Sequence, residues 1–176
     1  MTKPYSNNIV FFDTEFTDLD PYKGELLSVG MIKPSGEELY LELEHQGETS
    51  DWVKKIVLPT LTDQKVSREE AKNRIREFIG DSMPYLVSYV NQFDAIYFYK
   101  LFGTENQPAY YIPIDFASIL FGFGIDPKDY GNRYSRLINT LDIDLSKFQK
   151  HHALDDARLL REMYLKFYER ISQWES

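Results

Sequence analysis

The N-terminal part of the sequence holds an apolar run that ends in a pair of acids, and this run constrains the fold more than any other stretch. Residues 9–12 are all apolar and β-forming, and Asp13-Thr14-Glu15-Phe16 follows directly. Length and composition predict a central strand, because a strand buried on both faces reads as a nearly continuous apolar run. Side chains two residues apart share a face of a strand, so Asp13 and Glu15 should project together.

Two carboxylates at the end of a buried strand need compensation. They repel each other and take up protons unless their charge is stabilised. A bound cation is one solution. The other is a solvated strand end that leads into an acidic loop, which Asp18 and Asp20 favour. The strand by itself leaves both interpretations open.

The next two segments predict strands joined to the first by short connections. Leu26–Ile32 is apolar and is followed by the turn residues Pro34-Ser35-Gly36. Residues 38–44 then alternate between leucine and polar side chains, which is typical of a half-exposed strand. We therefore expect an antiparallel meander of three strands, with the acid pair on its first strand.

A second strand-to-helix unit carries another candidate residue. Tyr85–Val90 has the composition of a buried strand, and Ala95–Phe102 predicts a helix that ends at Gly103. Asp94 therefore lies between the carboxyl end of a strand and the first turn of a helix, where binding sites of such sheets collect. Aspartate is also a preferred helix cap, so the local sequence leaves ligand and cap open.

The remaining elements complete an α/β pattern within a single domain, residues 1–176. The stretch Ser67-Arg68-Glu69-Glu70 is a capping box that begins a helix ending at Gly80. The longest helix should run from about Ala153 to Trp174, with an apolar stripe at spacings of three and four. Weaker patterns predict short helices over 50–58, 115–121 and 132–139, an edge strand over 110–114, and a connector over 141–148.

Composition limits the chemistry. The chain has no cysteine, so disulfides and thiolate metal sites are excluded, and the remaining oxygen and imidazole ligands suit magnesium, manganese or calcium. The net charge of −8 argues against binding nucleic acid by bulk electrostatics, but an acidic site neutralised by divalent cations is compatible with it. Without a signal-peptide run or an apolar stretch of membrane-span length, we expect a cytoplasmic protein that does not bind membranes.

The stretch from His151 to Ala157 holds two of the three histidines and two adjacent aspartates at the start of the long helix. A histidine and a carboxylate about one turn apart can share a face. Adjacent helix residues point about 100° apart, so only one of Asp155 and Asp156 can face a common site well. Acids converging from separate elements can hold a pair of hard cations, beside which a histidine can act as general base.

The order and spacing of these residues resemble the DEDDh family of 3′–5′ exonucleases in the ribonuclease H-like superfamily. The resemblance rests on the segments 11–16, 92–94 and 151–157, which look like the family's three exonuclease motifs. It implies an α/β fold with a mixed sheet, the antiparallel meander plus parallel strands, flanked by helices. It also implies two divalent cations, Mg²⁺ or Mn²⁺, held by four carboxylates: Asp13, Glu15, Asp94 and Asp156.

The resemblance implies that His151, five residues before Asp156, is the general base. His152, four residues before Asp156, is the alternative. The second motif departs from the common pattern, because Tyr89-Val90 stands where many members carry His-Asn. A small bacterial exoribonuclease group is similar in its Asp-Thr-Glu-Phe start, in Leu-Leu-Ser-Val-Gly after Gly24 and in its Tyr-rich second motif. That similarity implies trimming of RNA 3′ ends and a homodimer.

The sequence therefore predicts a metal-dependent 3′–5′ exonuclease that acts on single-stranded nucleic acid or 3′ overhangs. RNA is favoured over DNA, and nucleoside 5′-monophosphates would be released. Two alternatives remain from the residues alone. One is a ribonuclease H-type endonuclease, which also uses clustered acids and two metals. The other is an exonuclease-like module that binds nucleic acid without cleaving it.

Overall fold

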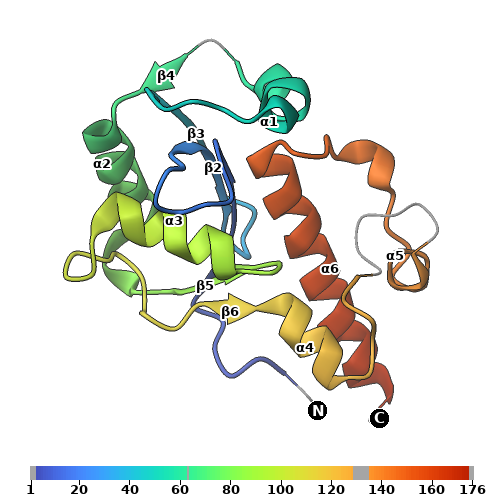
Figure 1. The fold of residues 1–176 in the computed structure, drawn as a ribbon. Coiled ribbons are helices and arrows are strands. Elements are labelled where there is room, and N and C mark those ends of the chain that lie inside the picture. The colour runs from blue at the N-terminus through green and yellow to red at the C-terminus, as the bar shows by residue number, and fades with distance from the viewer. Residues whose placement is uncertain (1–2, 63, 129–134, 175–176) are drawn as a thin grey trace.

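The computed structural model describes residues 3–62, 64–128 and 135–174, and a mixed sheet forms the centre of this part of the chain. The sheet has six strands in the order β4-β3-β2-β1-β5-β6 (Figure 1). These are β1 (Ile9–Phe16), β2 (Leu26–Ile32), β3 (Glu38–Leu43), β4 (Lys65–Val66), β5 (Tyr85–Ser88) and β6 (Ile114–Asp115). β1, β2 and β3 form an antiparallel meander and the other pairs are parallel, so the predicted fold class is confirmed.

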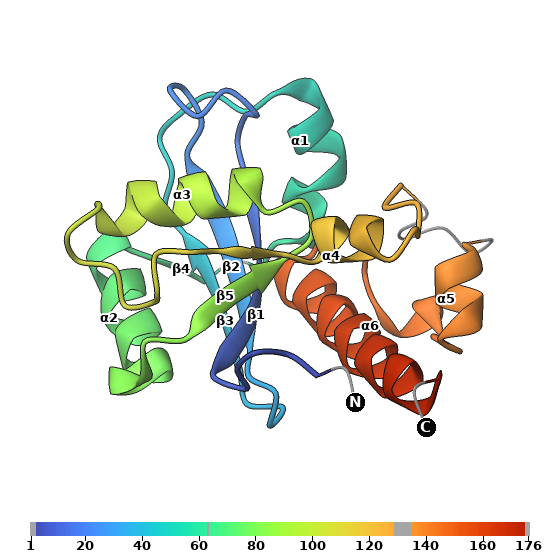
Figure 2. The ribbon, with the colours of Figure 1, turned by 90° about the horizontal axis from the view of Figure 1, so that it is seen from below.

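Helices cover both faces of this sheet. Figures 1 and 2 show α2 and α3 on one side, with α6 running along the other side next to α4 and α5. The α-helices are α1 (Asp51–Ile56), α2 (Arg68–Ile79), α3 (Gln92–Phe102), α4 (Phe116–Gly122), α5 (Arg136–Thr140) and α6 (Ala153–Trp174). The short 3₁₀ turns are η1 (Leu58–Thr60), η2 (Gly80–Ser82) and η3 (Leu145–Lys147).

The alternation of side chains along β1 divides the core into two parts. Phe11 packs on the α6 side, where its ring centroid lies 5.1 Å from that of Tyr164. Phe12 packs on the opposite side, 5.8 Å from the ring of Phe98 in α3. The same alternation continues to the end of the strand, so the acid pair faces α6, and the residues between and after the acids face α3.

Gly30 on β2 allows α6 to begin directly on the sheet. A Cβ atom added at Gly30 would lie 2.3 Å from the amide nitrogen of Leu154 and 2.4 Å from the carbonyl oxygen of Ala153. Gly30 is also the β-sheet partner of Asp13. The first turn of α6 is therefore held beside the acid pair of β1.

Two strand predictions in the second half of the chain are wrong in extent. The strand predicted over 110–114 is a strand only at its last residue, because β6 consists of Ile114 and Asp115. Pro113 offers no amide donor, and the amide of Tyr110 binds the carbonyl of Pro84 outside any ladder. β5 ends at Ser88 instead of residue 90, because Val90 has a φ of 57° and leaves the strand conformation.

Other boundaries differ less. The helix predicted from Ala95 begins at Gln92, and the short strand β4 was not predicted. The weak helix predicted over 132–139 falls partly on 129–134, outside the described residues, and α5 covers the rest. The connector over 141–148 contains only the turn η3. Within the described ranges, no helix has both the length and the hydropathy needed to cross a bilayer.

Candidate active site

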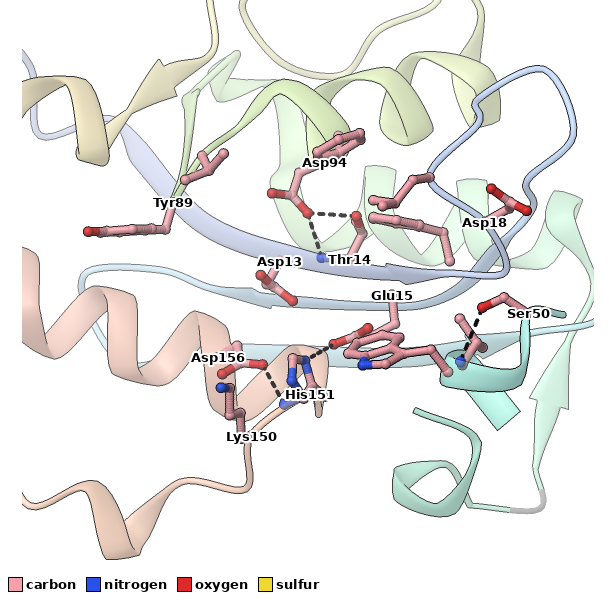
Figure 3. A pocket seen from close by; sticks show the side chains of 16 residues that line it. Asp13, Thr14, Glu15, Asp18, Ser50, Tyr89, Asp94, Lys150, His151 and Asp156 are labelled. Atoms are coloured by element: carbon pink, nitrogen blue, oxygen red, sulfur yellow. Dashed lines mark hydrogen bonds and ion pairs between the residues drawn. The ribbon is translucent and has the colours of Figure 1, made fainter. Parts of the chain in front are cut away.

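A cavity of about 620 Å³ opens where the end of β1 meets the first turns of α3 and α6 (Figure 3). Its walls include every residue predicted as a metal ligand or as the base. These are Asp13, Glu15, Asp94, His151 and Asp156. Three separate elements thus bring the predicted site residues to one place.

Asp13 and Glu15 point to the same side of β1, as their spacing predicts (Figure 3). Glu15 retains only 9 % of its accessible surface although it carries a carboxylate. A buried carboxylate is stable as an ion only when a cation or several hydrogen-bond donors compensate its charge. The hydrogen bonds of the described residues include none that either side chain accepts, so both have oxygen atoms free for an external ligand.

Asp94 is locked to β1 by a neighbouring side chain. Its Oδ1 atom accepts a hydrogen bond of 2.9 Å from the amide of Thr14 and one of 2.7 Å from the Thr14 hydroxyl. α3 begins at Gln92 after Asn91, so the alternative that Asp94 caps the helix is wrong. Thr14, on the opposite side of β1 from the acid pair, therefore joins α3 to the strand that carries that pair.

Asp156 and His151 are fixed to each other through the backbone. The amide of His151 donates to Oδ2 of Asp156 at 2.8 Å, and the His151 carbonyl accepts from the Thr60 hydroxyl, also at 2.8 Å. His151 has a φ of 62°, a left-handed conformation that these two contacts hold in place. Its Nδ1 atom lies 3.8 Å from Oε1 of Glu15, so the ring reaches from the turn before α6 towards β1.

The neighbours of these two residues point elsewhere. The ring of His152 packs on Tyr40, with 4.5 Å between ring centroids, and His152 does not line the cavity. Asp155 accepts hydrogen bonds from the amide of Gln149 and from Arg158, also outside the cavity. The structure thus places His151 and Asp156 in the cavity, and His152 and Asp155 in the packing beneath it.

Burial raises the pKa values of all four carboxyl groups, and repulsion from neighbouring carboxylates adds to the rise at Asp13, Glu15 and Asp156. Burial is the largest cause in each case. It raises the pKa of Glu15 to about 8, of Asp156 to about 7 and of Asp94 to about 6. The pKa of Asp13 is raised well above its ordinary value by burial and by the charges of the other three. Such a cluster favours a bound cation, because a cation removes the repulsion that protons otherwise relieve.

The donor set fits a divalent metal ion. Ligand atoms of Glu15, His151 and Asp156 all lie within 4.8 Å of one another. Carboxylate oxygens are the ligands that Mg²⁺ and Mn²⁺ prefer. The pKa of His151 is lowered, first by burial and then by the charge of Lys150, so its imidazole is neutral near pH 7. A neutral imidazole can bind a metal or accept a proton.

Several cavity residues were not predicted from the sequence. Leu19, Trp52 and Val90 contribute apolar surface, and Lys150 contributes a positive charge. They belong to loops and to a short helix, where no periodic pattern marks them. Phe16, which could either pack in the core or reach a ligand, lines the cavity and also stacks on Tyr97, with 4.4 Å between ring centroids.

The comparison with curated proteins gives a distant relative. No protein-family model matches the chain. The chain is 25 % identical over 174 residues to a DNA polymerase III of PolC type from Thermotoga maritima. That alignment spans 93 % of this chain and 12 % of the polymerase.

The comparison with solved structures shows the fold. A zinc-bound Escherichia coli ExoI–ssDNA complex matches with a TM-score of 0.61 at 14 % identity, over 94 % of this chain and 40 % of that one. E. coli exonuclease I with a 5cy-dT13 oligonucleotide gives 0.57 at 14 % identity, over 95 % and 41 % of the two chains. A co-crystal of the yeast NOT1 MIF4G domain with CAF1 gives 0.56 at 12 % identity, over 96 % and 80 %. This chain therefore has the α/β fold found in exonuclease I and spans about two fifths of that protein's length.

Proposed function

We propose that this protein is a metal-dependent 3′–5′ exonuclease of the DEDD type. It hydrolyses the terminal phosphodiester of single-stranded nucleic acid or of a 3′ overhang and releases nucleoside 5′-monophosphates. The observation that carries the proposal is the convergence of four carboxylates and His151 on one cavity. The likeness to exonuclease I and to a PolC-type polymerase supports it.

Each residue of the site has a role that follows from its position. Asp13, Glu15 and Asp156 offer oxygen atoms from β1 and α6, and Asp94 completes the set from α3. Divalent cations bound by these groups would activate a water molecule and stabilise the charge of the leaving 3′ oxygen. His151 accepts the proton of the attacking water, for which its lowered pKa keeps it ready at neutral pH.

The apolar wall of the cavity suits a nucleobase. Leu19 and Trp52 keep 63 % and 54 % of their surface exposed at the cavity, although both are large apolar side chains. Exposed apolar groups beside charged ones are typical of a binding site. The rings of Trp52 and His151 meet edge to face, with 5.1 Å between centroids, so a nucleobase packed on Trp52 lies next to the proposed general base His151.

The preference for RNA stays a prediction, as does the closeness to the small bacterial exoribonucleases. Two of the similar solved structures are complexes of exonuclease I with ssDNA or a dT13 oligonucleotide, and a relative in sequence is a DNA polymerase. RNA and DNA differ at the 2′-hydroxyl, which only specific contacts can read. Matched 5′-labelled RNA and DNA strands of one sequence, each assayed with Mg²⁺ and with Mn²⁺, measure the preference directly.

The same labelled strands separate an exonuclease from a ribonuclease H-type endonuclease. The proposal predicts a ladder of products shortened one nucleotide at a time from the 3′ end. A circular strand and a strand with a blocked 3′ end should remain intact. Cleavage of the circle would favour the endonuclease and contradict the proposal.

The remaining alternative is a module that binds nucleic acid without cleaving it. The raised carboxyl pKa values count against this alternative, since anionic substrate would add to the repulsion unless cations were bound. A titration with Mg²⁺ or Mn²⁺ decides the matter, because a binding module releases no nucleotide at any metal concentration. The homodimer and the cytoplasmic location stay predictions from the sequence.

A further inference from the structure

One basic side chain, that of Lys150, lies among the acidic residues of the cavity. Of the described residues that line it, Lys150 is the only lysine or arginine, while Asp13, Glu15, Asp18, Asp94 and Asp156 are acidic. Figure 3 shows the Lys150 side chain next to Asp156 and His151, at the start of α6. Its positive charge acts on both residues: it contributes to the lowered pKa of His151 and opposes the rise in the pKa of Asp156 that burial causes.

Lys150 is not held by the protein. Its side chain is exposed, and its Nζ atom makes no hydrogen bond and no ion pair of 4.0 Å or less with any described residue. Other basic groups of the described chain are engaged, such as Arg158 with Glu38 and Asp155, or Lys100 with the carbonyl of Gly24. A free ammonium beside this cavity is therefore available to an anion.

In the described part of the chain, the start of α6 also offers Lys150 no partner of its own. Lys150 comes three residues before Ala153, the first residue of α6, where the helix dipole is positive. That end of the helix already receives the carboxylates of Asp155 and Asp156, which bind the amides of Gln149 and His151. The local packing thus uses acids to stabilise the helix end and leaves the lysine without a structural role among the described residues.

We infer that the Lys150 ammonium binds a backbone phosphate of the polynucleotide substrate. The inference rests on the proposed function and deepens it. Two divalent cations carry a charge of +4, which the four carboxylates already balance, so the phosphates of a strand lying in the cavity need another positive partner. In a chain with a net charge of −8, the unpaired ammonium of Lys150 is the group of the cavity wall that meets such a phosphate.

The test uses the salt dependence of cleavage, which a merely structural role would not change. The value of kcat/KM on a single-stranded oligonucleotide is measured from 50 to 500 mM KCl at a fixed Mg²⁺ concentration. Losing one phosphate contact makes the plot of log kcat/KM against log salt shallower by about 0.7. For Lys150→Gln, we therefore expect a fall across this range that is about fivefold smaller than that of the wild type.

Two further variants make the comparison sharp. Lys150→Arg keeps the charge and should keep the wild-type slope. Arg170→Gln removes an equal charge from the far end of α6, about 21 Å along the helix from Asp156, and should also keep that slope. Thermal unfolding confirms that each variant is folded.

The outcomes separate the two claims. A wild-type protein without activity at any salt concentration defeats the proposed function itself. An active wild type with Lys150→Gln on the same slope defeats the inference alone. So does a Lys150→Arg variant that behaves like Lys150→Gln, because charge would then not be the cause.

Discussion

At the scale of single residues, the structure separates two histidines that are adjacent in sequence. His151 is the one that faces the acids. Its backbone is left-handed, and hydrogen bonds to Asp156 and from Thr60 hold it in that conformation. The ring of His152 packs against Tyr40, outside the cavity. Spacing alone could not decide between them, since both lie about one turn before Asp156.

Replacing each histidine with glutamine tests this assignment. His151→Gln should lower kcat by roughly 10²–10⁴-fold near pH 7.5, the usual contribution of a general base. His152→Gln should change kcat only a few-fold and act mainly on the melting temperature, because it loses contact with the Tyr40 ring. Steady-state kinetics and thermal unfolding on both proteins measure this. A larger loss of kcat in His152→Gln would reverse the assignment.

Asp13 is repelled by all three of the other carboxylates. Its pKa is raised by burial and by Asp94, Asp156 and Glu15. Asp13→Asn should abolish cleavage, since it removes an oxygen ligand and a charge. Without metal, the variant and the wild type should melt at similar temperatures at pH 5, where the carboxyl is protonated.

At pH 8.5 the metal-free Asp13→Asn protein should be the more stable of the two. The gain should appear as a higher melting temperature, because asparagine removes the buried charge that repels the other carboxylates. Melting curves in EDTA at the two pH values measure it. A variant that melts below the wild type at pH 8.5 would show that Asp13 is held by favourable contacts instead.

At the scale of elements, the contact between α6 and β2 positions the site. Gly30 leaves no room for a side chain under Ala153 and Leu154. The same contact places Asp156 and His151 above the acid pair of β1. A shift of the first turn of α6 would therefore separate ligands that come from different elements.

Gly30→Ala should displace that turn and reduce activity at least tenfold, together with a lower melting temperature. Gly122→Ala is the matched control, because a Cβ atom there meets nothing within 4 Å and Gly122 has no positive φ. Activity and melting temperature are compared for the two variants. If Gly30→Ala kept full activity, the close approach of α6 would not matter for the site.

Much of this arrangement could be predicted at the level of elements. The apolar run of β1, the alternation of β3 and the stripe of α6 each identify their element by periodicity. Pro113 and the left-handed Val90 ended strands that composition favoured, and β4 is too short to show a pattern.

The predicted site depended on different information. The four metal ligands were predicted from the order of the three exonuclease motifs. Periodicity could not supply them, because it does not show that α3 and α6 meet at the end of β1. Leu19, Trp52 and Lys150 could not be found at all, because their place in the cavity depends on how loops fold over it.

At the scale of the whole molecule, the acid cluster links stability to pH and metal. Glu15, Asp94 and Asp156 have folded pKa values of about 8, 6 and 7, all above their ordinary values of 4.5, 3.8 and 3.8. The folded state therefore binds protons more tightly than the unfolded state. This contribution to stability is complete below about pH 4 and is lost as pH rises through about 8.

The metal-free protein should accordingly melt at a lower temperature at pH 8.5 than at pH 5. Mn²⁺ should raise the melting temperature, and by more at pH 8.5, where fewer protons compete for the carboxylates. Melting curves with EDTA and with Mn²⁺ across this range measure both effects, with Asp13→Asn as the variant that should respond less. A metal effect that grew towards acid pH would contradict the linkage.

If these carboxylates support metal-dependent hydrolysis at a 3′ end, the chemical identity of the released product must show it. Single-stranded oligonucleotide is incubated with the protein and Mg²⁺ or Mn²⁺, and the small products are separated and identified by mass and by comparison with standards. We predict nucleoside 5′-monophosphates, released only while divalent metal is present and absent with Asp13→Asn. Nucleoside 3′-monophosphates, or the same rate of release in EDTA, would contradict it.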